Sequence, residues 1–83
     1  MAITVRYFAS LREVLGASET MPWVAGQTLG QLRDALIARG APHAQALARG
    51  RALRCALNQV MADETTGVPD GAEVAFFPPV TGG

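Results

Sequence analysis

The last six residues of the chain carry the group with the clearest chemical potential. The sequence ends in Pro-Pro-Val-Thr-Gly-Gly over residues 78–83, which places the terminal carboxylate on Gly83. With a reference pKa of about 3.5, this carboxylate is ionised at neutral pH and can attack an activated phosphate. The acyl adenylate formed in that way can accept sulfur and leave a C-terminal thiocarboxylate. Gly83 is therefore the candidate reactive site.

The residues before Gly83 are suited to reach into another protein. Pro78 and Pro79 cannot donate to a sheet ladder and favour an extended backbone, so a strand should end before them. Val80, Thr81, Gly82 and Gly83 span roughly 13 Å when extended, and the two glycines carry no Cβ that would block a narrow channel. A Gly-Gly end by itself is more typical of a frayed terminus. The rest of the sequence must decide between these interpretations.

Other reactive side chains give weaker signals. Cys55 lies on the same predicted strand face as Leu53 and Leu57, which favours a small buried hydrophobe over a sulfur relay. His43 is the only histidine, and no second histidine or cysteine pair gives it metal-ligand spacing, so no metal site is predicted. The acidic pair at 63–64 precedes two threonines and is interpreted as a solvated loop.

Composition excludes several classes of function. A chain of 83 residues with 49% hydrophobic and 17% charged residues is expected to fold as one small globular domain. The seven basic residues are all arginine, they balance seven acids, and they form no basic patch, which disfavours nucleic-acid binding. Without lysine the chain cannot form a phosphate-binding loop, so any ATP chemistry belongs to a partner. Apart from the N-terminus, the chain also offers no amine to capture an activated tail.

The compartment is expected to be the cytoplasm. The N-terminal residues show no charged leader followed by an apolar stretch, and no segment has the length of a membrane span. A single cysteine cannot form an internal disulfide. We therefore expect no membrane partner.

Hydrophobic periodicity predicts an α+β fold with a mixed sheet packed on one main helix. Thr28 and Gln31 occupy the positions of a capping box and start this helix, and Gly40 followed by Pro42 stops it. Strands are predicted over 3–8, 19–24, 53–58 and 73–77, with a short edge strand before the last; short helical segments are predicted over 10–16 and 42–50. The predicted domain covers 1–77, and 78–83 form a flexible tail.

The sequence resembles the small subunits of molybdopterin synthase, a family of ubiquitin-like sulfur carriers. The most specific segment is Glu-Val-Ala-Phe-Phe-Pro-Pro-Val-Thr-Gly-Gly at 73–83, which is similar to the tail of that family. The first strand, with Tyr-Phe-Ala at 7–9 and Leu-Arg-Glu at 11–13, and the central strand, with Leu-Asn-Gln at 57–59, also look like family segments. A Pro-rich turn at 68–73 precedes the last strand, so the resemblance spans essentially the whole chain.

The resemblance implies a ubiquitin-like β-grasp fold and a defined role for Gly83. In this family an E1-like enzyme adenylates the terminal glycine with ATP, and a sulfur donor converts it to a thiocarboxylate. The tail then enters the large subunit, where sulfur passes to cyclic pyranopterin monophosphate, and two carriers are consumed per dithiolene. The family complex is a heterotetramer of two small and two large subunits. The small subunit binds no cofactor and supplies no catalytic side chain, although it is a subunit of a sulfurtransferase.

The resemblance also predicts a docking face. Ile3, Val5 and Tyr7 share one face of the first strand, which leaves Phe8 on the other, and Phe77 is outward in the last strand by the same alternation. If these strands are neighbours, as in β-grasp proteins, Phe8 and Phe77 form an aromatic patch at the root of the tail. Met61, Pro78 and Pro79 are predicted to extend this patch, which would bind the large subunit and the activating enzyme.

Two alternatives stay open at this point. A related carrier for thiamine, cysteine or tRNA thiolation would share the fold and the Gly-Gly end, but it is not expected to show Phe-Phe-Pro-Pro before them. A non-catalytic interaction module would carry an idle tail. A residue appended after Gly83 should abolish the function of any carrier and leave the binding of such a module intact.

Overall fold

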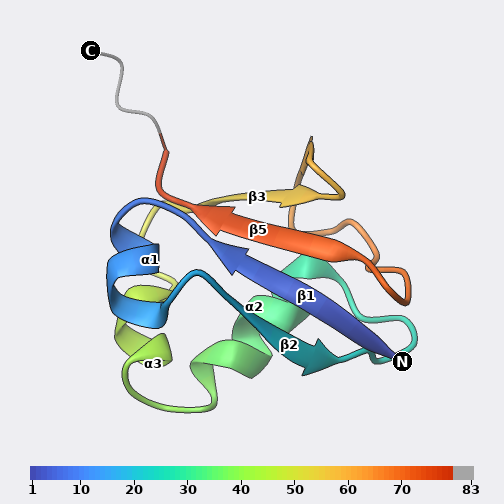
Figure 1. Ribbon diagram of the computed structural model, residues 1–83, viewed down its shortest axis with the longest axis horizontal. Coiled ribbons are helices and arrows are strands. Elements are labelled where there is room, and N and C mark those ends of the chain that lie inside the picture. Colours follow the sequence, from blue (N-terminus) through green and yellow to red (C-terminus); the bar gives the residue numbers. More distant parts are fainter. Residues whose placement is uncertain (80–83) are drawn as a thin grey trace.

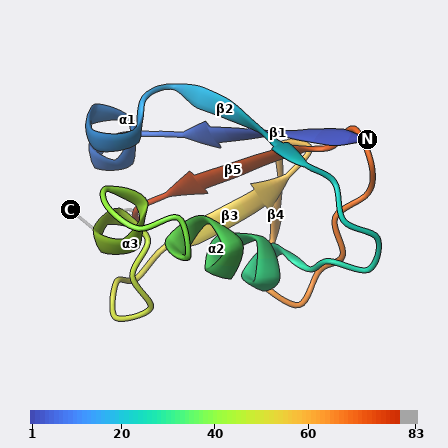
Figure 2. The same ribbon diagram turned by 90° about the horizontal axis from the view of Figure 1, so that it is seen from below.

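Five strands form one mixed sheet, and the computed structural model describes residues 1–79 of the chain. The strand order is β2-β1-β5-β3-β4, with β1 and β5 parallel and the other neighbours antiparallel. The strands are β1 (Ala2–Tyr7), β2 (Ser18–Pro22), β3 (Arg54–Leu57), β4 (Val60–Ala62) and β5 (Glu73–Phe77); Figure 1 labels all of them except β4, which is labelled in Figure 2. The helices are α1 (Ser10–Leu15), α2 (Leu29–Ile37) and α3 (His43–Ala46). This confirms the predicted mixed sheet with one main helix.

The main helix starts where the capping signal predicts. Thr28 Oγ1 accepts a hydrogen bond from the Gln31 amide at 3.2 Å, and the Thr28 amide donates to Gln31 Oε1 at 2.9 Å. The predicted stop at Gly40 is also close to the observed end of the helix at Ile37. Backbone hydrogen bonds from the amide of residue 39 to the carbonyl of residue 36, and from 40 to 37, continue the turn beyond Ile37. Gly40 has a φ of +85°, which glycine adopts without the usual steric cost.

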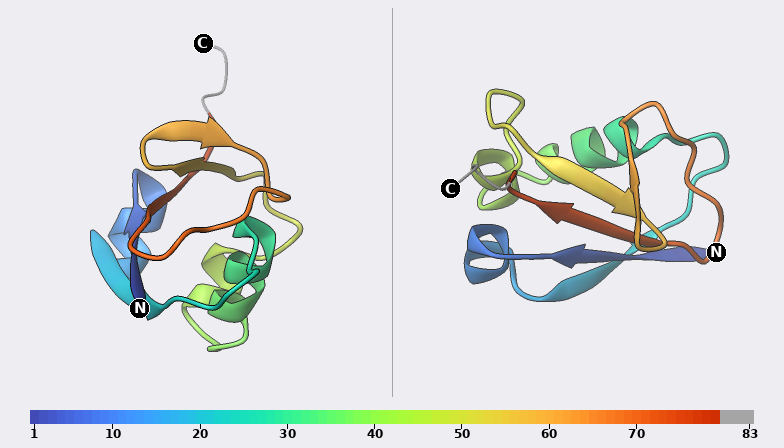
Figure 3. Two further views of the ribbon diagram at one scale, coloured as in Figure 1. Left: turned by 90° about the vertical axis from the view of Figure 1, so that its right-hand side faces the viewer. Right: turned by 90° about the horizontal axis from the view of Figure 1, so that it is seen from above.

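One face of the sheet is covered by helices and the other is open (Figures 2 and 3). The covered face carries the residues that alternation assigns to the core in β1 and β5. Each of these is at most 1% exposed: Ile3, Val5, Tyr7, Val74 and Phe76. They pack with the buried leucines of α2, which are Leu29, Leu32 and Leu36. The period-two pattern therefore predicted the buried faces of β1 and β5 correctly.

The loop of the β3–β4 hairpin adds two hydrogen bonds to the antiparallel pairing of β3 with β5. Asn58 and Gln59 form its two-residue loop, and both have positive φ (49° and 70°), as a type I′ turn requires. The Asn58 amide donates to the Glu73 carbonyl at 2.8 Å, and Asn58 Oδ1 accepts from the Glu73 amide at 2.9 Å. These two bonds fix the hairpin against the first residue of β5.

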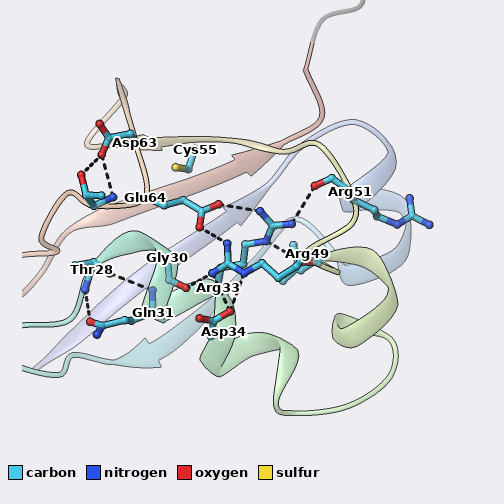
Figure 4. A network of polar contacts seen from close by, with 12 residues as sticks. Thr28, Gly30, Gln31, Arg33, Asp34, Arg49, Arg51, Cys55, Asp63 and Glu64 are labelled. Carbon is cyan, nitrogen blue, oxygen red and sulfur yellow. Dashed lines mark hydrogen bonds and ion pairs between the residues drawn. The ribbon is translucent and has the colours of Figure 1, made fainter.

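The loop at 63–66 departs from its interpretation as a solvated loop. Figure 4 shows Glu64 between two arginines, and it forms ion pairs with Arg33 (2.9 Å) and with Arg49. Arg33 is only 3% exposed and also donates to three backbone carbonyls in the segment 47–51. The hydrogen bond from Arg49 holds the pKa of Glu64 below its ordinary value. Glu64 therefore links α2 to its neighbours, and of the two acids only Asp63 is exposed as expected.

The described chain ends just after the last strand. β5 ends at Phe77, as the two following prolines predict, and residues 78 and 79 have no regular structure. The division into a domain over 1–77 and a flexible tail over 78–83 stays a prediction, since 80–83 lie outside the described residues. Over residues 1–79, each helix is too short or too polar to cross a membrane.

Candidate functional site

The open face of the sheet contains an apolar groove beside the end of β5. Its volume is about 580 Å³, and it is lined by side chains from β1, from the β3–β4 hairpin and from β5. The lining includes Arg6, Phe8, Gln59, Met61, Glu73, Phe77 and Pro78. Four of the five residues predicted for the docking face therefore surround one groove. The fifth, Pro79, is partly exposed and follows Pro78 but does not line the groove.

Sheet register explains why the two phenylalanines meet. Tyr7 lies opposite Phe76 in the parallel pair of β1 and β5, so the next residues, Phe8 and Phe77, point to the other face together. Their ring centroids are 6.5 Å apart with planes at 86°, which is an edge-to-face contact. Phe8 is 37% exposed and Phe77 is partly buried. The predicted aromatic patch is thus confirmed in its geometry, while its role in docking stays a prediction.

Met61 and the hairpin form the far wall of the groove. Met61 is 57% exposed and lies opposite Ala56 in the register of β3 and β4. Ala56 and Ala75 form part of the groove lining and are small enough to leave space between the larger side chains. An exposed thioether beside two aromatic rings is typical of a protein-binding surface.

Two charged residues in the groove were not identified as site residues from the sequence. Arg6 holds its guanidinium carbon 5.2 Å from the centroid of the Phe8 ring. One of its nitrogens lies 3.8 Å from a carboxylate oxygen of Glu73. The alternation that places Phe8 on the open face places Arg6 there too, so the signal was present in the sequence. It was overlooked because a single exposed arginine in a strand is unremarkable.

The predicted reactive site lies beyond the described residues. Gly83, and the threading residues Val80, Thr81 and Gly82, are outside 1–79. The structure does describe the residues that lead to this segment. Phe77 and Pro78 line the groove, and Pro79 connects them to Val80. Any protein that binds the groove therefore contacts the chain next to the start of the tail.

Cys55 and His43 are structural residues. Cys55 is 5% exposed, its thiol donates to the Ala62 carbonyl at 3.2 Å, and burial raises its pKa above the ordinary value. This confirms the prediction of a buried small hydrophobe. His43 Nε2 lies 2.7 Å from Glu19 Oε2 on the covered side of the sheet. Among residues 1–79, no three His, Cys, Asp or Glu side chains are grouped so that they could hold a metal ion.

Glu19 is the centre of a polar cluster that sequence patterns did not reveal. Its carboxylate accepts a hydrogen bond from the Tyr7 hydroxyl at 2.7 Å and also contacts Arg39 and His43. Burial alone would raise the pKa of Glu19, but hydrogen bonds from Arg39, Tyr7 and His43 lower it to about 2. Burial and the bond to Glu19 raise the pKa of Tyr7. The cluster joins β1, β2 and the segment around α3, on the face opposite the groove.

Comparison with known proteins now identifies the family. Residues 5–83 match the model of the ThiS family. The chain belongs to this family. The chain is also 41% identical over 81 residues to the molybdopterin synthase sulfur carrier subunit of Escherichia coli (strain K12). This alignment covers 98% of this chain and 99% of the relative.

Two solved structures of other proteins are similar to this chain along its whole length. The crystal structure of SAMP1 from Haloferax volcanii is similar with a TM-score of 0.76 and 26% identity, and it covers 100% of both chains. Subunits 1 and 2 of molybdopterin-converting factor from Helicobacter pylori 26695 have been solved as a protein–protein complex. One chain of it matches with a TM-score of 0.68 and 25% identity over 100% of both chains. The fold is therefore the ubiquitin-like β-grasp, as the resemblance implied.

Proposed function

We propose that this ThiS family member is a sulfur carrier in molybdenum cofactor biosynthesis and acts as the small subunit of molybdopterin synthase. The observation that carries the proposal is the 41% identity to a sulfur carrier subunit of that enzyme over 98% of the chain. The match to the ThiS family, which extends to residue 83, supports it. The apolar groove at the root of the Gly-Gly segment offers such a carrier a site for docking and supports the proposal.

The proposed chemistry takes place at the carboxylate of Gly83. One carboxylate oxygen attacks the α-phosphate of ATP on an E1-like enzyme, and pyrophosphate leaves. A sulfur donor then displaces AMP and leaves a thiocarboxylate. In the large subunit the thiocarboxylate sulfur is transferred to cyclic pyranopterin monophosphate, and water restores the carboxylate of Gly83. ATP is used by the activating enzyme, so the carrier chain itself needs no cofactor.

The groove is the proposed binding site for the large subunit. The Helicobacter pylori complex of subunits 1 and 2 supports a partner of this kind. Phe8, Met61 and Phe77 supply the apolar contact area, and Pro78 and Pro79 lead from it toward the threading residues Val80, Thr81 and Gly82. We further propose that the assembly contains two small and two large subunits, that the activating enzyme uses the same groove, and that the carrier works in the cytoplasm.

Reconstitution followed by intact-mass measurement tests this function. The chain is incubated with ATP, an E1-like activating enzyme and a sulfur source, and fragment masses then locate any change. Exchange of one oxygen for sulfur at Gly83 is the expected result. The matched control is a chain with one residue appended after Gly83, which should stay unmodified. An unchanged mass in the presence of an activating enzyme of proven competence would contradict the proposal.

A further inference from the structure

Within residues 1–79, the groove holds a cation, Arg6, whose hydrogen-bonding capacity is largely unused. The side chain of Arg6 is 43% exposed, and its guanidinium lies over the Phe8 ring, 5.2 Å from the centroid. Its ion pair with Glu73 has a nitrogen–oxygen distance of 3.8 Å, which is too long for a hydrogen bond. Stacking on an aromatic ring leaves the edge of a guanidinium free to donate. Arg6 therefore presents donors into the groove.

A second arginine of the same chain shows what a buried guanidinium requires. Arg33 is 3% exposed and donates to Glu64 at 2.9 Å and to three backbone carbonyls at 2.6 to 3.1 Å. Each of the three guanidinium nitrogens of Arg33 has at least one acceptor. When a partner covers the groove, Arg6 loses water in the same way, and an unpaired buried charge is strongly unfavourable. Glu73 at 3.8 Å does not supply acceptors of comparable quality.

We propose that the surface which docks in this groove presents an aspartate or glutamate carboxylate to Arg6, beside apolar side chains that contact Phe8 and Phe77. The inference rests on the proposed function, since the partner in question is the large subunit of molybdopterin synthase. A carboxylate accepts two parallel bonds from a guanidinium edge, which a point charge on lysine cannot reproduce. Arg6 would thus select among large subunits that share an apolar contact surface.

Glu73 is the competing acceptor within the chain, and it makes the proposal sharply testable. If Glu73 neutralises Arg6 in the complex, removing its charge should weaken docking as much as removing Arg6. If the partner supplies the carboxylate, Glu73 is a nearby like charge, and Glu73→Gln should leave docking unchanged or strengthen it. The hydrogen bonds between Glu73 and Asn58 involve only the backbone amide and carbonyl of Glu73, so this substitution preserves the contact with the hairpin.

The experiment measures the dissociation constant for the large subunit at about 50 and 300 mM salt, since ionic screening changes greatly over this range. Arg6→Gln should raise it by about 5- to 50-fold at low salt and reduce its salt dependence. Arg6→Lys should keep most of the salt dependence. Arg51→Gln is the matched control, because Arg51 is exposed, does not line the groove and loses the same charge. Thermal melting verifies that each variant is folded.

Three results would overturn the inference. The first is a change of less than twofold in the dissociation constant for Arg6→Gln. The second is weaker binding by Arg6→Gln with the salt dependence of the wild type, which would indicate a carbonyl acceptor. The third is a loss of affinity for Glu73→Gln equal to that for Arg6→Gln. The proposed function is tested separately in the same series. If the wild-type chain does not bind the large subunit, both proposals fail, whereas binding that is lost in Phe77→Ala but insensitive to Arg6 removes only the inference.

Discussion

The Glu19 cluster predicts a specific loss of stability when the carboxylate is replaced by an amide. In Glu19→Gln the side chain keeps its size and can still accept from the Tyr7 hydroxyl, but it no longer carries the charge that pairs with Arg39. The change therefore isolates the electrostatic part of the cluster. Glu19 and the docking groove lie on opposite faces of the sheet, so binding to partners should be unaffected.

The size of the effect follows from the pKa of Glu19. A fall from 4.5 to about 2 corresponds to about 3 kcal/mol of stability, since one unit is about 1.4 kcal/mol. Because the Glu19 side chain is 21% exposed and Gln retains a hydrogen bond, we expect Glu19→Gln to cost about 2 kcal/mol at pH 7. For a domain of this size that loss lowers the melting temperature by about 10 °C.

The pH dependence gives a second, independent readout. A carboxyl group whose pKa is lowered on folding stabilises the protein fully above its unfolded value, near 4.5, and this contribution disappears as the pH falls through about 2. The difference between wild type and Glu19→Gln should thus shrink to about a quarter of its neutral value near pH 2.5. Urea unfolding between pH 7 and pH 2.5 measures it. Glu13→Gln, at an exposed position of α1, is the control. A pH-independent difference, or a loss below about 0.5 kcal/mol at pH 7, would refute the reasoning.

Three further substitutions test the groove, the tail and the helix start. Phe77→Ala should weaken binding to the large subunit by about 1 to 3 kcal/mol in calorimetry with little loss of stability; unfolding with unchanged affinity of the folded fraction would make Phe77 a core residue. Gly82→Leu should melt like wild type but fail to be adenylated or to transfer sulfur in the mass assay, and wild-type activity would remove the threading hypothesis. Gly30→Ala should destabilise by about 1 to 3 kcal/mol in urea, although alanine normally favours a helix, because its Cβ would lie 3.0 Å from Glu64 Oε1 and 3.2 Å from the Glu64 carbonyl. Increased stability would show that Glu64 moves freely.

The features that sequence patterns predicted are those encoded within a few residues. The start of α2 depends on Thr28 and Gln31, three positions apart, and the face of β1 depends on alternation. The contacts that were missed join distant residues: Glu64 reaches Arg33 across 31 positions, and Glu19 reaches His43 across 24. No local pattern indicates that an arginine on an amphipathic helix is 3% exposed, because the carbonyls that satisfy it come from another segment.

The position of β5 in the sheet explains how docking can control the terminal residues. β5 is paired with β1 on one side and with β3 on the other, so its backbone is fixed along both edges. The groove is built from side chains of the same strand and its neighbours, and Pro78 is both a groove residue and the first residue of the exit segment. A partner that binds the groove therefore holds the start of the exit segment in a fixed position relative to the sheet. Beyond Pro79, a fully extended chain of the four residues 80–83 would reach roughly 13 Å, which limits how far from the groove a partner's reaction centre for Gly83 should lie.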